Sequence, residues 1–251
     1  MVYINGRPER MKSLAALCAV ALFVFPLVAG ADNNKTLQSI RGHVAYQRGN
    51  AAQKPLATNA TIVLADRDYA MTGAQSQGAV TLADSSRVTM GSETKVQLAF
   101  FNQAAGNNAK FLLLGGKTRF EVQHPSGAKA NYIFSTPTAD IAVRGTEGDI
   151  SVSQDQLQVN VYGVSDPSLP VAVTFTTGDK AGQTVTVTAG ESLTASYVNG
   201  IITEQKEKLT EQILAPFNTE FGNPVSCWRC AVEGLKNSLI NQVKSHIPIP
   251  F

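Results

Sequence analysis

The sequence predicts a mainly β protein with a small helical segment at its C-terminal end. From Ile40 to Val198, short runs rich in Val, Thr, Ile and Phe alternate with Gly, Asn, Asp or Pro. A new run begins roughly every ten residues, which is typical of a sandwich, a barrel or a short solenoid. No exact repeat is visible, so a regular repeat array is not expected.

Residues 1–31 are predicted to be a secretory signal peptide. A basic residue precedes an apolar run over residues 14–28, which is short for a membrane span. The small residues Ala29 and Ala31 occupy the cleavage positions, so we expect cleavage after Ala31. The mature protein is therefore expected to be periplasmic or secreted, without stable membrane insertion. Met11 is an alternative start of the chain.

The charge balance gives no indication of a nucleic acid or an anionic membrane as partner. The full chain has 21 basic and 19 acidic residues. Loss of residues 1–31 removes three basic residues and one acidic residue, which leaves 18 of each. A neutral mature chain lacks the basic field that such partners require.

Strands are expected throughout a β domain over residues 32–200. Each candidate is bounded by turn-forming residues and is rich in β-branched or aromatic side chains. The candidates are residues 40–47, 60–64, 79–83, 88–91, 95–101, 111–114, 119–123, 132–135, 140–144, 149–153, 157–162, 171–176, 183–188 and 192–197.

A helical appendage is expected over residues 201–251. Residues 203–217 have apolar side chains at helical spacing, although Pro216 interrupts the pattern. Ser226 is a candidate cap for a second helix, whose apolar stripe would comprise Trp228, Val232, Leu235, Leu239 and Val243. We expect these helices to cover an open end or edge of the β domain, since exposed sheet edges promote aggregation.

One stretch of the predicted β domain carries a distinctive pattern, from Phe134 to Thr146. Pro137 fixes its own φ and favours an extended Thr136, and Gly145 permits a turn beside Arg144. Further turn and strand residues precede it in a fixed order: Asp68, Thr72, Gly73, Asp84 and Gly116, followed by Thr136, Pro137, Arg144, Gly145 and Thr146.

This order of motifs resembles the FecR domain, an all-β extracytoplasmic module of bacterial proteins, over about residues 60–165. The chain departs from the family pattern at two turns, where Arg67 and Ser85 replace the usual glycines. The resemblance implies a short, irregular β-helix or a sandwich.

The resemblance also implies a role in extracytoplasmic signalling, often between an outer-membrane transporter and a sigma-factor regulator. The transducing members have a cytoplasmic helical segment and a membrane helix. Here the only apolar helix is expected to be cleaved, so we do not expect direct control of a sigma factor. We expect a non-enzymatic protein-interaction, signalling-related or envelope-scaffold module, with a protein partner in the cell envelope and no cofactor.

Cys227 and Cys230 form the only cysteine pair of the expected mature chain. In an exported protein the default expectation is a small disulfide. The alternative is a thiol–disulfide redox protein, because a helix start and Arg229 would favour a thiolate at Cys227. The βαβ context of a thioredoxin-like fold is missing from the sequence. A polysaccharide-binding β-helix ranks below both, since no row of aromatic residues is evident.

Arg144 lies in an apolar strand, and a partly buried guanidinium must be paired because it cannot lose its charge. We expect it to bridge to an aspartate or to carbonyls of an adjacent strand, with Asp140 or Asp84 as the leading partners, and so to fix the strand register. The aspartates themselves are expected to accept backbone N–H bonds in turns, which applies to Asp68, Asp84 and Asp140.

No metal, cofactor or catalytic site is expected. Two carboxylate pairs, Asp66 with Asp68 and Glu147 with Asp149, are two residues apart and so share a strand face. Neither pair has the ligand density or the glycine placement of a calcium loop. The histidines are scattered along the chain, at His43, His124 and His246.

Overall fold

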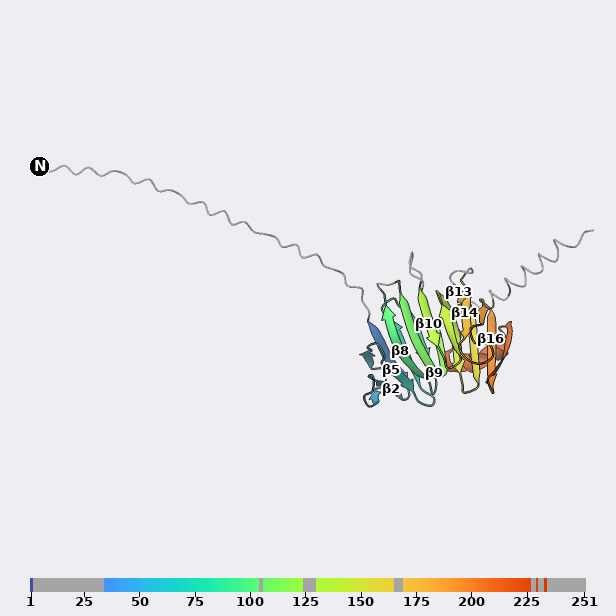
Figure 1. The fold of residues 1–251 in the computed structure, drawn as a ribbon. Helices are drawn as coiled ribbons and strands as arrows, with labels where there is room; N and C mark the ends of the chain where they lie inside the picture. The colour runs from blue at the N-terminus through green and yellow to red at the C-terminus, as the bar shows by residue number, and fades with distance from the viewer. Residues whose placement is uncertain are drawn as a thin grey trace, which may run out of the picture. The chain divides into compact units, whose positions relative to one another are not determined.

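The computed structural model describes residues 34–103, 106–123, 130–164 and 169–226, together with Met1, Arg229 and Glu233. These residues form seventeen strands and one helix (Figure 1), which confirms a mainly β chain with a short C-terminal helix. The elements are β1 (Lys35–Arg41), β2 (Val44–Gln47), β3 (Lys54–Leu56), β4 (Thr61–Val63), β5 (Tyr69–Thr72), β6 (Gln77–Leu82), β7 (Arg87–Met90), β8 (Lys95–Asn102), β9 (Asn108–Glu121), β10 (Asn131–Ser135), β11 (Ala139–Val143), β12 (Thr146–Val152), β13 (Gln156–Val164), β14 (Val171–Phe175), β15 (Thr184–Val187), β16 (Glu191–Val198), β17 (Ile201–Lys208) and α1 (Glu211–Phe221).

The strands pair into two sheets that share β9. Sheet A has the order β4-β1-β6-β7-β9-β12-β13-β16-β17. Sheet B has the order β3-β2-β5-β8-β9-β10-β11-β14-β15. Every pair is antiparallel except that of β9 and β10. Of the two architectures that the sequence left open, the antiparallel pairing gives the sandwich, because a β-helix stacks parallel strands.

β9 passes from sheet B to sheet A at two consecutive glycines. Gly115 still pairs with β8, whereas Gly116 pairs with β12. Gly116 has a φ of 93°, and a Cβ on it would lie 2.5 Å from the Cα of Thr94. The crossing therefore requires glycine at this position. The sequence predicted two strands, residues 111–114 and 119–123, where the structure has one strand that changes sheets.

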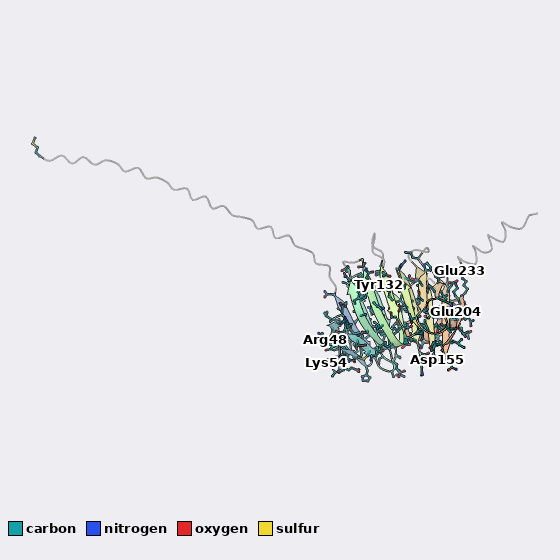
Figure 2. All side chains as sticks on the ribbon, in the orientation of Figure 1. Arg48, Lys54, Tyr132, Asp155, Glu204 and Glu233 are labelled. Atoms are coloured by element: carbon teal, nitrogen blue, oxygen red, sulfur yellow. The ribbon has the colours of Figure 1, made fainter. Side chains whose placement is uncertain are left out.

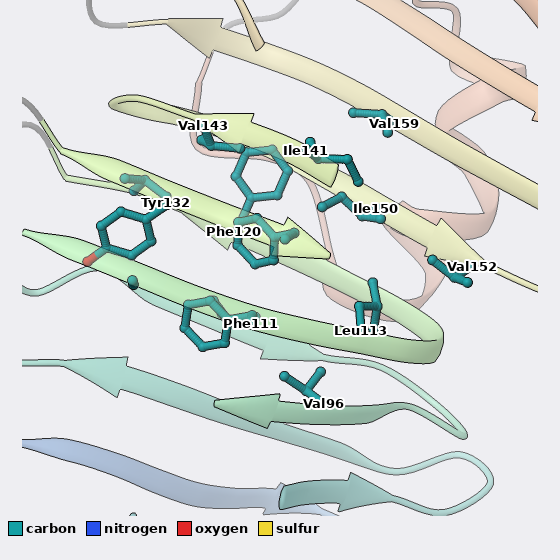
Figure 3. Close-up of a cluster of buried hydrophobic side chains, with 14 of the residues drawn as sticks. Val96, Phe111, Leu113, Phe120, Tyr132, Ile141, Val143, Ile150, Val152 and Val159 are labelled. Carbon is teal, nitrogen blue, oxygen red and sulfur yellow. The ribbon is translucent and has the colours of Figure 1, made fainter. Parts of the chain in front are cut away.

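The core lies between the two sheets and is built from the alternate side chains of their strands (Figure 3). Phe120 comes from the sheet A part of β9 and packs on Phe134 of sheet B, with ring centroids 5.4 Å apart. Phe111 stacks on the same ring at 5.2 Å. All three rings are almost inaccessible to solvent, and each contributes about 1.5–3 kcal/mol to stability through burial.

Both ends of the sandwich carry features that discourage further strand pairing. β3 contains Pro55, which cannot donate to a ladder, next to Lys54 at the end of the sandwich opposite Glu204 (Figure 2). On β17, Glu204 pairs with Lys180 at 3.1 Å, and Lys206 donates to the carbonyl of Thr186 on β15 at 3.3 Å. These bonds join the edges of sheets A and B.

The expected helix over residues 203–217 is wrong in its first half. Residues 201–208 form β17, which pairs with β16 through a two-residue turn at Asn199 and Gly200. These two residues have φ values of 50° and 81°, as a type I′ hairpin turn requires. The Asn-Gly pair specifies this turn, and the long hairpin overrides the helical propensity of the Glu and Lys residues that follow.

Helix α1 begins after Thr210, whose hydroxyl accepts from the N–H of Ile213 at 3.3 Å. It continues through Pro216 to Phe221, so the proline does not end it. Leu214 and Phe217 are its buried residues, and Leu214 forms a small second cluster with Tyr162 of β13. The helix thus covers the outer face of sheet A, rather than an open end or edge of the domain.

Candidate functional site

Two of the aspartates that were predicted to hold turns, Asp68 and Asp84, do so. The carboxylate of Asp68 accepts from the N–H of Ala65 at 2.9 Å, and that of Asp84 accepts from the N–H of Ser86 at 2.9 Å. Both confirm the predicted turn roles. Arg67 and Ser85 each have a φ of 68°, so the usual family glycines are replaced at positions with left-handed backbone.

Asp84 also accepts the hydroxyl of Tyr132 at 2.5 Å, which links the turn to sheet B. Burial and the bond to Asp84 raise the pKa of Tyr132 above its ordinary value. Asp140 differs from its predicted role, because its carboxylate accepts from the hydroxyl of Ser135 at 2.5 Å. The prediction of a backbone N–H donor was wrong there.

Thr72 and Gly73 join β5 to the turn before β8. The Thr72 hydroxyl donates to the carbonyl of Gly91 at 2.5 Å and accepts from the N–H of Thr94 at 2.9 Å. The N–H of Gly73 donates to the carbonyl of His43 at 2.9 Å. These family-motif residues therefore anchor connections between strands.

The turn at Pro137 is held by Thr136, whose hydroxyl donates to the carbonyl of Ala139 at 2.9 Å and accepts from its N–H at 3.0 Å. At the other end of β11, Gly145 has a φ of 67°. The next residue, Thr146, is buried, and its carbonyl accepts from the N–H of Val122 at 3.0 Å. The motif from Thr136 to Thr146 thus forms a turn, a strand and a second corner.

The predicted ion pair of Arg144 is wrong. Arg144 is exposed, and within the described residues it pairs with no carboxylate. Both expected partners are engaged elsewhere, Asp84 with Tyr132 and Asp140 with Ser135. Arg144 lies between β11 and β12, at the corner rather than within a strand, so its side chain reaches solvent and needs no partner.

Among the described residues the buried arginine is Arg119, which was not predicted from the sequence. It lies on β9 directly opposite Asp149 of β12. Its Nε donates to Oδ1 of Asp149 at 2.8 Å, and its Nη2 donates to Oδ2 at 3.2 Å, which makes the pair bidentate. The hydroxyl of Tyr162 on β13 also donates to this carboxylate.

The Arg119–Asp149 pair is withdrawn from water, and this changes the pKa values of its members. Burial disfavours the charged guanidinium, but the hydrogen bonds and charge of Asp149 outweigh burial, so the pKa of Arg119 is raised. Burial also raises the pKa of Asp149, and the bonds and charge of Arg119 oppose that shift. Burial, with the charge of Asp149, raises the pKa of the Tyr162 hydroxyl.

The face of sheet A that carries Arg119 also binds the residues that follow helix α1. Nη1 of Arg119 donates to the carbonyl of Gly222 at 2.7 Å. The carboxylate of Glu147 on β12 accepts from the N–H of Val225 at 2.9 Å and from the N–H of Ser226 at 2.6 Å. Charged side chains of the sheet therefore hold the backbone of a distant segment.

Helix α1 is fixed to the sheet by Glu220. Its carboxylate accepts from the N–H of Ser92 and lies 3.5 Å from Nζ of Lys117. The fit is close, since a Cβ on Gly91 would lie 2.5 Å from the carboxylate of Glu220. Gly91 therefore allows the helix to approach the turn after β7.

An open hollow of about 330 Å³ adjoins the residues after the helix. It lies between the ends of β9, β12 and β13, and Glu121 and Glu147, which are opposite one another across β9 and β12, border it. Its lining is Glu121, Val122, Gln123, Gly145, Thr146, Glu147, Gly163, Val225 and Ser226.

Several predicted residues lie outside the described ranges. They include the predicted cleavage residues Ala29 and Ala31, the pair Cys227 and Cys230, and His124 and His246. The signal peptide, the disulfide and the redox alternative therefore stay predictions. Within the described ranges, no three His, Cys, Asp or Glu side chains gather as a metal site would need. None of the helices in this part of the chain is long and apolar enough to cross a membrane.

Comparison with known proteins identifies the central part of the chain. Residues 68–163 match the family model described as FecR protein. Two crystal structures of a candidate anti-sigma factor from Parabacteroides distasonis, at 1.65 and 2.50 Å resolution, are 18% identical, with TM-scores of 0.47 and 0.46. Each match covers 60% of this chain and 64% of the other, so the chain spans less than two thirds of those proteins. No curated protein matches the chain. Residues 68–163, which run from the Asp68 turn into the last part of β13, therefore form a FecR domain.

Proposed function

We propose that this chain is a non-enzymatic, extracytoplasmic FecR-domain protein that binds a protein partner in the cell envelope, in a signalling-related or scaffold role. One observation carries the proposal. The outer face of sheet A holds the backbone of another segment through Arg119 and Glu147. Such a surface has the chemistry of peptide recognition, in which backbone groups supply the hydrogen bonds.

The charged groups beneath α1 support a binding role rather than a catalytic one, because they are already engaged. Asp149 accepts hydrogen bonds from Arg119 and Tyr162 on both of its carboxylate oxygens. Glu147 uses both carboxylate oxygens on backbone N–H groups. Residues occupied in this way organise a surface, whereas a general acid or base must be able to reach a substrate proton.

Site-specific photo-crosslinking in cells that express the full chain tests the proposal. A benzoylphenylalanine at Gln123, which lines the hollow, is expected to give one predominant adduct with an envelope protein. The same group at Lys54, at the far end of the sandwich, serves as the control and should not give that adduct. Equal adduct patterns at the two positions, or none at either, would contradict the proposed function.

The location of the protein needs a separate test. N-terminal sequencing of the protein recovered from the periplasm or medium should begin at Asp32, because cleavage is expected after Ala31. Retention of the apolar run of residues 14–28 would contradict the export proposal and would indicate a membrane-anchored form.

A further inference from the structure

The five residues 222–226, here called the strap, follow helix α1 and lie on the outer face of sheet A. Arg119 donates to the carbonyl at the start of the strap, that of Gly222. Glu147 accepts the N–H groups at its end, those of Val225 and Ser226. All three bonds involve a charged side chain, which makes them stronger than bonds between neutral groups.

The three hydrogen bonds that hold the strap on sheet A use its backbone groups. Val225 is 88% exposed, and Asn223 is also exposed. Gly163 allows the strap to approach β13 closely, because a Cβ at this position would lie only 3.0 Å from the side chain of Ser226. The surface therefore selects a bent backbone that directs two successive N–H groups to the same side, and its hydrogen bonds place little demand on the sequence.

The strap fills only part of the surface. Val225 and Ser226 form one wall of the hollow, and the remaining walls are the ends of β9, β12 and β13. Its volume of about 330 Å³ is at the lower end of the range for ligand sites, about 300–1,000 Å³. Thr146 lines it, and the buried Oγ1 of Thr146 has no hydrogen-bond partner among the described residues. A longer segment would thus find both space and an unused polar group.

We propose that the strap is an exchangeable internal ligand, and that a segment of the protein partner with the same bent backbone replaces it on sheet A. The incoming segment would donate two successive backbone N–H groups to Glu147, accept from Arg119, and continue into the hollow. This inference rests on the proposed function and specifies how the partner is bound and regulated. The tethered strap lowers the apparent affinity for any partner, because the surface is free only when the strap is detached.

Exchange of the strap leaves the rest of the fold in place. Helix α1 keeps its own anchors, which are the buried Leu214 and Phe217 and the carboxylate of Glu220 on Ser92 and Lys117. The Arg119–Asp149 pair is likewise made within the sheet. Among the described residues, the bonds that join the strap to sheet A and that detachment breaks are those at Gly222, Val225 and Ser226.

A labelled peptide with the sequence of residues 219–226, blocked at both ends, tests the exchange by fluorescence anisotropy against the full chain. Val225→Pro removes one strap N–H and leaves the surface intact, so this variant should bind the peptide about tenfold more tightly than the wild type. Adding Glu147→Gln should reverse the gain by about tenfold or more, because the amide nitrogen of Gln cannot accept an N–H. Adding Glu121→Gln is the matched control, since Glu121 lines the same hollow but bonds no strap atom among the described residues, and binding should be unchanged.

Equal binding by the wild type and Val225→Pro would overturn the proposal, as would equal binding with and without Glu147→Gln. Ser226→Pro provides a second way to free the surface, and circular dichroism checks that each variant is folded. Failure of this test, together with a specific adduct at Gln123, would remove the exchange and leave the proposed function standing. Absence of the adduct at Gln123 would contradict the proposed function itself.

Discussion

The guanidinium of Arg119 lies 2.8 Å from the carboxylate of Asp149, and the two side chains are 5% and 0% exposed. They lie opposite one another on β9 and β12, in the centre of sheet A. Arg119 also bonds the carbonyl of Gly222 and faces the rings of Tyr162 and Phe221 at 5.2 and 5.3 Å. One buried pair thus connects the FecR domain to the segment that covers it.

Removal of one partner of this pair should be strongly destabilising. Asp149→Leu leaves the Arg119 guanidinium buried without its counter-charge, which costs about 3–5 kcal/mol. The double variant Arg119→Met, Asp149→Leu should cost clearly less than the sum of Arg119→Met alone and Asp149→Leu alone, since it leaves no charge buried without a partner. Urea unfolding of the three variants measures these free energies. Additive losses would contradict the interpretation that the two residues act as a pair.

Glu191 makes the stability of the β16–β17 hairpin vary with pH in the acid range. Burial opposes the charge of Glu191, but the N–H of Thr188 and the ammonium of Lys208 outweigh it and lower its pKa from 4.5 to about 2. A lowered pKa stabilises the native state above pH 4.5, and this contribution is lost as the pH falls towards 2.

Comparison of the wild type with Glu191→Gln isolates this effect, because all other acids are common to both. The variant should be less stable by about 1–2 kcal/mol at pH 7, after allowance for screening. The difference should shrink to near zero at pH 2. A difference that stays constant over this range would show that Glu191 does not titrate with a lowered pKa. Urea unfolding at several pH values provides the measurement.

The two glycines where β9 changes sheets should respond very differently to substitution. Gly116→Ala forces a side chain into left-handed backbone and against Thr94, so we expect a loss of about 2–4 kcal/mol. Gly115→Ala is the matched control, because no atom lies within 4 Å of its added Cβ. Thermal unfolding compares the two. Similar midpoints would contradict the geometry of the crossing.

The two departures from the FecR pattern predict stabilising substitutions. Arg67 and Ser85 hold left-handed backbone at a φ of 68°, which costs a non-glycine residue about 1–2 kcal/mol. Arg67→Gly and Ser85→Gly remove this cost, but the greater unfolded-state entropy of glycine offsets part of the gain, so each should stabilise the protein by about 0.5–1 kcal/mol. Glu207→Gly, within strand β17, should instead destabilise, and it serves as the control in urea unfolding.

The sequence predicted the β fold and its turns well because local chemistry decides them. Asp68, Asp84 and Thr136 each bond to backbone within three residues, so their roles follow from the neighbouring sequence. The helical spacing of residues 203–208 predicted a helix, but these residues belong to strand β17. The pairing with β16 that overrides it depends on the Asn199–Gly200 turn, a hairpin signal that the sequence contains.

The functional surface could not be predicted in the same way. Arg119 and Asp149 are thirty residues apart, and Glu147 bonds Val225 across seventy-eight residues. Such contacts depend on the register of β9 with β12 and on the path of the chain after α1. The apolar neighbours of Arg144 resemble a buried strand and so predict a paired arginine there. Its place at a corner exposes it instead.

The central claim is that charged side chains on sheet A bind peptide backbone, and the amide protons of Val225 and Ser226 report on it directly. Hydrogen exchange followed by NMR should show both amides protected in the wild type and in Glu121→Gln. In Glu147→Gln, exchange at both amides should be about tenfold faster or more, while the amides of β9 and β12 stay unchanged. Unprotected amides at Val225 and Ser226 in the wild type would contradict the account.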